Sequence, residues 1–218
     1  MDMEKNYLKI IFVIDESGSM QGTESDVIGG FNNFIKEQKS KPYGNVDVTL
    51  YKFNNESSRV FRDLPLERIR TLDARDYSPG GLTALYDTIG IAINEAEAHL
   101  SYLKKEDKPD MVMMVIITDG QENASREYSS HRVKELIEKH EKSEAWQFIY
   151  LGADLSSFAD ADTLGIRHRA SSSKANLKEK FGQVSEHTVY FREAKNLNAN
   201  MDEYVAKFIE DLDDKQGD

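Results

Sequence analysis

The sequence contains no cysteine among its 218 residues, and this absence removes several kinds of site. Neither a disulfide framework nor thiolate ligation of zinc or iron is available to the chain. Any bound metal ion must therefore be held by oxygen atoms or by imidazole nitrogens. The five histidines are scattered and form no HxxxH pair, so we interpret each of them as a surface or packing residue.

The chain also lacks an excess of basic residues and an apolar run long enough to span a membrane. The 28 Lys and Arg residues are outnumbered by 39 Asp and Glu residues, which gives a net charge of −11. This balance disfavours nucleic acid as a partner, because the phosphate backbone needs clustered Lys and Arg. No segment approaches the ~20 apolar residues of a membrane span, and the stretch MDMEKNYLK lacks the pattern of a secretory signal. We therefore expect a cytoplasmic protein that binds neither nucleic acid nor membrane.

Apolar segments along the chain alternate between strand-like and helix-like patterns, which predicts an α/β fold. The runs 10–14 and 111–117 show no alternation, so we expect central strands that are buried on both faces and are neighbours or near neighbours. Segment 46–53 alternates, and the polar link after it predicts a hairpin to a short antiparallel edge strand at 58–61. Further strands are expected at 146–151 and 166–170. The prediction is a doubly wound, mostly parallel sheet of about six strands with helices on both faces.

Helical spacing of apolar residues predicts helices at 85–103, 133–140 and 174–193. We expect one domain over 1–195, followed at 196–218 by an acidic helical extension. Gly29 and Gly30 lie inside another helical stretch. Because neither GxGxxG nor GxxxxGK is present, we interpret this glycine pair as close packing against a neighbour and not as a phosphate loop.

Small oxygen-bearing side chains follow the two most apolar runs. In DESGS, Asp15, Ser17 and Ser19 stand at alternate positions, so in extended backbone they point the same way. Asp119 ends the second run in ITDG, and Thr83 follows a glycine pair just before a predicted helix. Ligands of open α/β sheets bind beyond the carboxyl ends of the strands, so we expect these three loops to converge there.

A hard divalent cation suits this group of side chains, because Mg²⁺ prefers carboxylate, hydroxyl and water oxygens. Gly18 allows a tight turn, while Gly80 and Gly81 allow the second loop to approach closely. Gly120 belongs to the supporting loops, and we interpret Asn123 as shaping its own loop. Mg²⁺ is the expected ion and Mn²⁺ the alternative, whereas few carboxylates and a small cage disfavour Ca²⁺. The predicted ligands are Asp15, Ser17, Ser19, Thr83 and Asp119.

These motifs resemble the metal-ion-dependent adhesion site of von Willebrand factor A-type (vWA) domains. The pattern of that site is DxSxS followed by a separate Thr and a separate Asp, matched here by DESGS, by Thr83 in GGLTALYD and by Asp119 in ITDG. The resemblance covers roughly 7–191 in order and spacing. The stretches TDGQEN and WQFIYLGAD resemble the stand-alone prokaryotic and phage branch, not the secreted adhesive one.

The resemblance implies a protein-interaction module that performs no turnover. By analogy Ser17, Ser19 and Thr83 would bind the ion directly, and Asp15 and Asp119 would bind it directly or through water. A partner's Asp or Glu would fill the remaining coordination position. In related prokaryotic systems such domains often accompany ATPases of the AAA+ type, which makes an AAA+ ATPase an expected partner.

Three other functions compete with the interaction module. A strand-terminal Asp beside Mg²⁺ is also how a haloacid-dehalogenase-type phosphatase begins its chemistry, but that family has a second Asp where Ser17 stands here. A Ser–His–Asp hydrolase is disfavoured, since the serines are not in GxSxG. The third possibility is a scaffold whose metal site is structural and whose segment 201–212 docks the partner.

Overall fold

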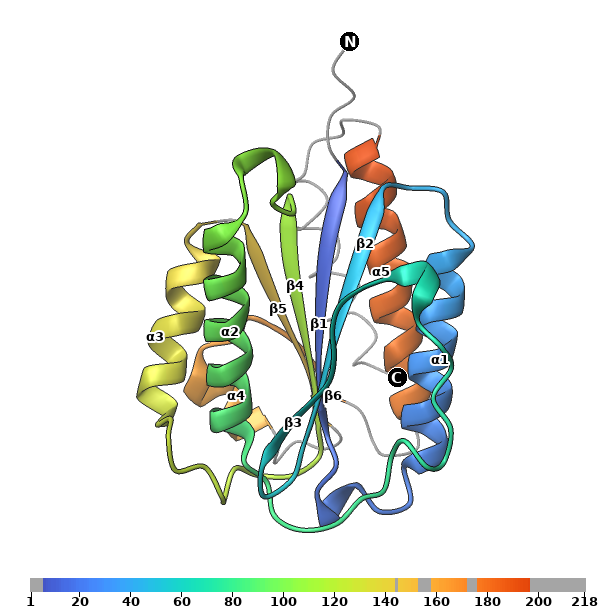
Figure 1. Ribbon diagram of the computed structural model, residues 1–218. Helices are drawn as coiled ribbons and strands as arrows, with labels where there is room; N and C mark the ends of the chain where they lie inside the picture. Colours follow the sequence, from blue (N-terminus) through green and yellow to red (C-terminus); the bar gives the residue numbers. More distant parts are fainter. Residues whose placement is uncertain (1–5, 144, 153–157, 172–175, 197–218) are drawn as a thin grey trace.

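The computed structural model describes residues 6–143, 145–152, 158–171 and 176–196, and it contains one six-stranded sheet (Figure 1). The strand order is β3-β2-β1-β4-β5-β6, and every neighbouring pair is parallel except β2 and β3. This arrangement confirms the predicted mostly parallel sheet and the predicted neighbours. The strands are β1 (Tyr7–Asp15), β2 (Asn45–Phe53), β3 (Ser57–Pro65), β4 (Met111–Thr118), β5 (Trp146–Gly152) and β6 (His168–Ser171).

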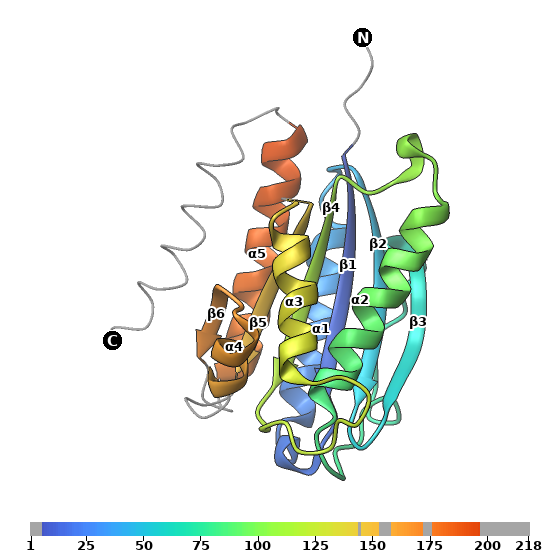
Figure 2. The same ribbon diagram turned by 90° about the vertical axis from the view of Figure 1, so that its left-hand side faces the viewer.

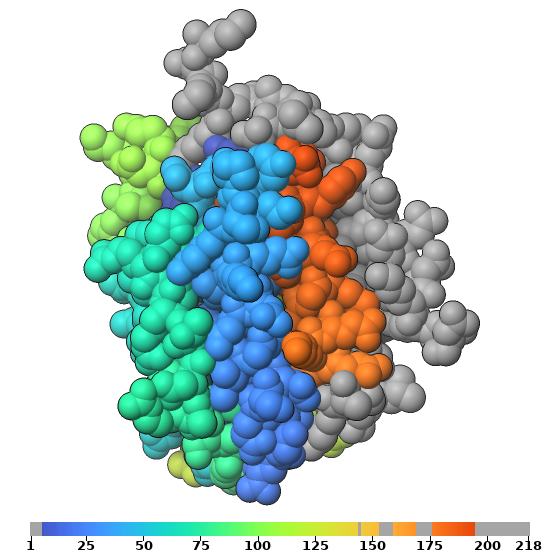
Figure 3. All heavy atoms as spheres, turned by 90° about the vertical axis from the view of Figure 1, so that its right-hand side faces the viewer, coloured from blue at the N-terminus to red at the C-terminus, as the bar shows by residue number. Residues whose placement is uncertain are grey.

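Helices cover both faces of the sheet (Figures 1 and 2). On one face α1 (Glu24–Lys39) and α5 (Leu177–Asn196) lie side by side, as Figure 3 also shows in blue and orange. The other face carries α2 (Leu85–Tyr102), α3 (Ser130–Glu141) and α4 (Phe158–Leu164). Each face has its own apolar core, and both cores draw on β1 and β4. This two-sided burial explains the continuous apolar runs 10–14 in β1 and 111–117 in β4.

The edge strand β3 is antiparallel as predicted, but it is not short, because it has nine residues. Two irregularities interrupt its pairing with β2. In the second half of β3, Asp63 has a left-handed φ of 48°. Its backbone N–H donates to Thr49 Oγ1 at 3.0 Å, and its carboxylate forms an ion pair with Lys9. These contacts carry the strand on to Pro65. They join residues far apart in the sequence, so the local apolar pattern did not reveal them.

The remaining boundaries agree with expectation to within a few residues. The helices predicted at 85–103, 133–140 and 174–193 correspond to α2, α3 and α5, although position 174 lies outside the described residues. The short helix α4 was not predicted. The expected extension at 196–218 also lies outside the described residues beyond Asn196. Among the described helices, none combines the length and apolarity needed to cross a membrane.

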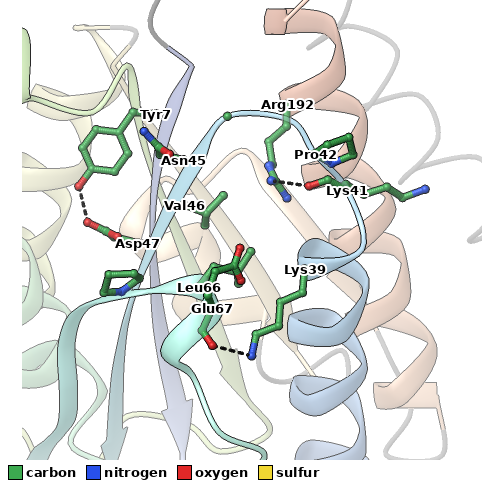
Figure 4. Close-up of a pocket in the computed structure, with 12 residues that line it drawn as sticks. Tyr7, Lys39, Lys41, Pro42, Asn45, Val46, Asp47, Leu66, Glu67 and Arg192 are labelled. Atoms are coloured by element: carbon green, nitrogen blue, oxygen red, sulfur yellow. Dashed lines mark hydrogen bonds between the residues drawn. The ribbon is translucent and has the colours of Figure 1, made fainter.

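The C-terminal end of α1 is joined to α5 by Arg192 (Figure 4). Its guanidinium donates to the backbone carbonyls of Gln38, Lys41 and Tyr43 at 2.9, 3.2 and 2.8 Å. A positive charge at this end also complements the helix dipole. The arginine borders a hollow of about 560 Å³ beside the first residues of β1 and β2, at the end of the sheet opposite the carboxyl edge.

Only one member of the glycine pair in α1 faces α5. A Cβ placed on Gly30 would lie 2.4 Å from Cδ2 of Phe181, whereas one on Gly29 would meet no described atom within 4 Å. We expect Gly30→Ala to lower the free energy of unfolding by about 1–3 kcal/mol through overpacking. Gly29→Ala should raise it by up to about 1 kcal/mol, because alanine favours the helix. Urea unfolding compares the two variants, and similar effects at both positions would contradict the packing role of Gly30.

Candidate functional site

The five predicted ligands lie at the carboxyl edge of the parallel strands, at the lower edge of Figure 1. Asp15 is the last residue of β1, and Asp119 directly follows β4, the neighbour of β1. Ser17 and Ser19 lie in the turn after β1, which includes the short 3₁₀ helix η1 (Gly18–Met20). Thr83 stands two residues before α2. Parallel pairing of β1 with β4 therefore places the ends of both strands at one edge.

The side-chain oxygens of these loops surround a single point next to Gly120. A Cβ placed on Gly120 would lie 2.8 Å from both Ser19 Oγ and Thr83 Oγ1, and 3.3 Å from Asp15 Oδ2. Ser17 Oγ lies 2.9 Å from Ser19 Oγ. Oxygen atoms from the end of β1, from the turn after it and from the loop before α2 thus come close together. They do so beside Gly120, which lies in the loop after β4 and has no side chain. The absence of a Cβ on Gly120 leaves the space between them open.

The carboxylate of Asp15 is fully buried and held from both sides. Its Oδ1 accepts from the Ser17 backbone N–H at 2.7 Å, and its Oδ2 accepts from Thr118 Oγ1 at 2.6 Å. Burial, helped by the negative charge of Asp119, raises the pKa of the Asp15 carboxyl to about 6, although the hydrogen bonds oppose this rise. Two buried carboxylates close together are costly when ionised, so a cation beside them would stabilise the charged form.

The predicted supporting glycines bring two loops into contact. Gly18 N–H donates to Gly81 O at 3.0 Å, and Gly80 N–H donates to Glu16 O at 2.9 Å. A Cβ on Gly18 would lie 3.3 Å from Gly81 O, and Gly81 itself has a left-handed φ of 87°. Both of these positions therefore favour glycine. At Gly80, by contrast, a Cβ would meet no described atom within 4 Å.

Asn123 holds the backbone of Thr83 in place. Its Oδ1 accepts from the Thr83 N–H at 2.9 Å, and its own N–H donates to Thr83 O at 3.0 Å. This paired contact joins the loop of Asn123 to the loop of Thr83, so Asn123 holds more than its own loop. On the other side, Leu82 N–H donates to Asn55 Oδ1 at 3.0 Å, and Ala84 N–H donates to Asn54 O at 2.8 Å. The loop that carries Thr83 is thus held from both flanks.

Several residues of the site were not predicted from the sequence. Thr118 orients Asp15 and also bonds the backbone of Gly120, and its place directly before Asp119 could have suggested this role. Tyr77 donates its hydroxyl to Asp15 O at 2.6 Å, and no local pattern points to that contact. Glu122 accepts the N–H groups of its own loop and that of Tyr86. These residues position the ligand loops without adding oxygen atoms at the central point.

The donor set suits a hard divalent cation. It consists of two carboxylates and three hydroxyls, which are the oxygen types that Mg²⁺ and Mn²⁺ accept. Within the described ranges, no three His, Cys, Asp or Glu side chains come together in a way that would hold a metal ion, so a cation at this point would need hydroxyl oxygens as well. Asp15, Ser17 and Thr83 are buried, whereas Ser19 and neighbouring Leu82 are exposed. Solvent or a partner can therefore reach the site from the Ser19 side.

No protein-family model matches the chain, and a search of curated proteins found no match either. Solved structures do match it. Proximal thread matrix protein 1 from the mussel byssus, in a structure with a zinc-occupied MIDAS motif, aligns with a TM-score of 0.53 and 16% identity over 84% of this chain and 46% of that one. The PilB minor pilin from Streptococcus sanguinis gives a TM-score of 0.61 and 13% identity over 84% of this chain and 61% of that one.

A third match is the vWF domain of the type V pili tip protein Mfa5 from Porphyromonas gingivalis. It has a TM-score of 0.57 and 13% identity, over 82% of this chain and 94% of that domain. This chain therefore spans about half of the mussel protein and about three fifths of the pilin, but nearly all of the Mfa5 domain. At such identities the likeness is evidence of a shared fold, and function must be argued from the site. The chain has the fold of a von Willebrand factor A-type domain.

Proposed function

We propose that this chain is a metal-dependent protein-interaction module, in which a divalent cation at the carboxyl edge of the sheet binds an acidic residue of a partner. The observation that carries the proposal is the meeting of hydroxyl and carboxylate oxygens from two loops around the open point next to Gly120. Ser17, Ser19 and Thr83 would hold the ion, with Asp15 and Asp119 binding it directly or through water. The zinc-occupied MIDAS motif of the structurally similar mussel protein supports this assignment.

The charge of the site favours an anionic partner group. Three of the five proposed ligands are neutral hydroxyls, so where Asp15 and Asp119 bind through water the ion keeps much of its positive charge and attracts a carboxylate. The chain as a whole carries −11, which opposes an acidic partner at long range. At contact distance the ion outweighs that field, because distant surface charges are screened beyond about 10 Å at 0.1 M salt. We therefore propose an Asp or Glu on the partner, with an AAA+ ATPase as one candidate partner.

The surroundings of Asp15 argue against the phosphatase alternative. A nucleophilic carboxylate must present one oxygen to its substrate, but Asp15 is fully buried and both of its oxygens already accept hydrogen bonds. The position two residues later holds Ser17 and not the second Asp of such enzymes. A phosphatase screen with Mg²⁺ or Mn²⁺ tests this alternative, and turnover that disappears in Asp15→Asn would establish it.

Thermal melting with and without Mg²⁺ or Mn²⁺ tests the metal site. At a metal concentration roughly a hundred times Kd, binding stabilises the fold by about 2.7 kcal/mol, which for a chain of this size raises Tm by about 5–10 °C. The variant Ser17→Ala/Ser19→Ala should lose this shift while melting cooperatively. An equal shift in the variant would place the ion elsewhere and count against the proposal.

The partner step needs a separate comparison. Capture of candidate partners by the intact chain should require Mg²⁺ and should be abolished by a chelator, while Ser17→Ala/Ser19→Ala should capture nothing in either condition. A partner retained equally in chelator would favour the scaffold alternative, in which the metal site is only structural.

A further inference from the structure

Residues 76–81 form a strap that lies against the turn after β1. Gly80 N–H donates to Glu16 O at 2.9 Å, and Gly18 N–H donates to Gly81 O at 3.0 Å. Tyr77 adds its hydroxyl bond to Asp15 O. The strap ends two positions before Thr83, so its placement relative to the turn also sets where Thr83 stands relative to Ser17 and Ser19.

An ion pair ties the strap to β2 as well as to this turn. Glu16 Oε1 accepts from Lys52 Nζ at 2.8 Å and from the Ser78 N–H at 2.6 Å. Lys52 Nζ also donates to Asp76 O at 2.5 Å. The side chains of Glu16 and Lys52 are only 14% and 18% exposed. The pair therefore holds the first half of the strap, at Asp76 and Ser78, from a largely buried position.

We propose that Glu16 and Lys52 form a positioning pair for the metal site, an inference that rests on the proposed function. Glu16 stands between the proposed ligands Asp15 and Ser17, but its side chain contacts the strap and contributes no oxygen at the point next to Gly120. It acts through the strap on Thr83. The cation would then find its hydroxyl ligands already arranged, because strap and turn are held together before binding.

Removing the Glu16–Lys52 pair should weaken the support of Thr83 on one side only. Without the charge pair, Asn123 still holds the Thr83 backbone and Asn55 still holds Leu82. The strap keeps its two backbone bonds to the turn but loses its anchor on β2. Residues that orient metal ligands without touching the ion typically change metal affinity by about 10–100-fold. Because part of the support remains, we expect a change near the lower end, about tenfold.

Titration calorimetry with Mn²⁺ alone tests the pair in the full-length chain. Lys52→Met and Glu16→Gln should each bind Mn²⁺ about tenfold more weakly than the unmodified chain. The Mn²⁺ affinity of Lys52→Arg should stay within about twofold of that of the unmodified chain, because arginine keeps the positive charge. The matched control is Lys139→Met, which removes an exposed ion pair with Glu97 between α3 and α2 and should leave the affinity unchanged. Hydrogen exchange at the Ser78 and Gly80 amides should accelerate in Lys52→Met without metal.

The outcomes separate the two proposals. If the unmodified chain does not bind Mn²⁺, the proposed function fails and the positioning role fails with it. If the unmodified chain binds Mn²⁺ and both Lys52→Met and Glu16→Gln bind it equally well, only the positioning role is overturned. A lower Tm with unchanged Mn²⁺ affinity would likewise reduce the pair to a purely structural contact. Should Lys52→Met fail to fold, Glu16→Gln decides, since its amide oxygen can still accept from Ser78.

Discussion

Gly120→Ala is expected to abolish cation binding while the sheet and helices stay folded. The added methyl carbon would lie 2.8 Å from the hydroxyl oxygens of Ser19 and Thr83 and 3.3 Å from Asp15 Oδ2. The two distances of 2.8 Å are too short for contacts with a carbon atom, so the hydroxyls must turn away from the point they now surround. The methyl group would also occupy the place that we assign to the ion.

The control for this prediction is Gly80→Ala, which adds the same methyl group to a neighbouring loop where it meets no described atom within 4 Å. Calorimetry with Mg²⁺ and Mn²⁺ should show normal affinity for Gly80→Ala and no measurable heat of binding for Gly120→Ala. Circular dichroism of both variants checks the fold. Retained affinity in Gly120→Ala would show that the ion does not bind at this point.

Arg192→Met should produce the largest loss of stability, about 3–5 kcal/mol in the free energy of unfolding. Arg192 is only 2% exposed, and besides the three carbonyls its guanidinium donates to Gln38 Oε1 at 2.9 Å. Methionine fills similar space but donates no hydrogen bonds, so the buried Gln38 carbonyl and the partly buried Lys41 and Tyr43 carbonyls each lose a donor. Each unsatisfied buried group costs about 1–3 kcal/mol, and part of the total is recovered by relaxation.

Urea unfolding of Arg192→Met and Arg167→Met measures the effect. Arg167 is a suitable control because its side chain is 82% exposed and its Nε lies 3.7 Å from Glu141, which should be worth no more than about 0.5 kcal/mol. Arg192 lies at the end of the sheet opposite the candidate site, so Mn²⁺ affinity should be unchanged at temperatures where the variant remains folded. A loss below 1 kcal/mol would contradict the role assigned to Arg192.

Much of the fold could be predicted from the sequence, because burial of a strand on both faces requires a continuous run of apolar residues. The runs 10–14 in β1 and 111–117 in β4 are continuously apolar, and helical spacing marks α2, α3 and α5. The candidate ligands could also be placed, since DESGS and ITDG stand at the ends of the two central strands and parallel pairing takes both ends to one edge. These features depend on residues within a few positions of one another, or on a general rule of parallel sheets.

The tertiary structure alone decided how the loops are held and where packing is tight. The contacts of Asp15 with Tyr77 and Thr118 join residues 62 and 103 positions apart, and the Glu16–Lys52 pair spans 36 positions. The full length of β3 also depends on contacts with distant residues. So does the difference between Gly29 and Gly30, because only Gly30 lies against Phe181. Local periodicity reports which face of an element is buried, but not which distant side chain meets it there. Those contacts are determined by how the sheet and the helices pack together.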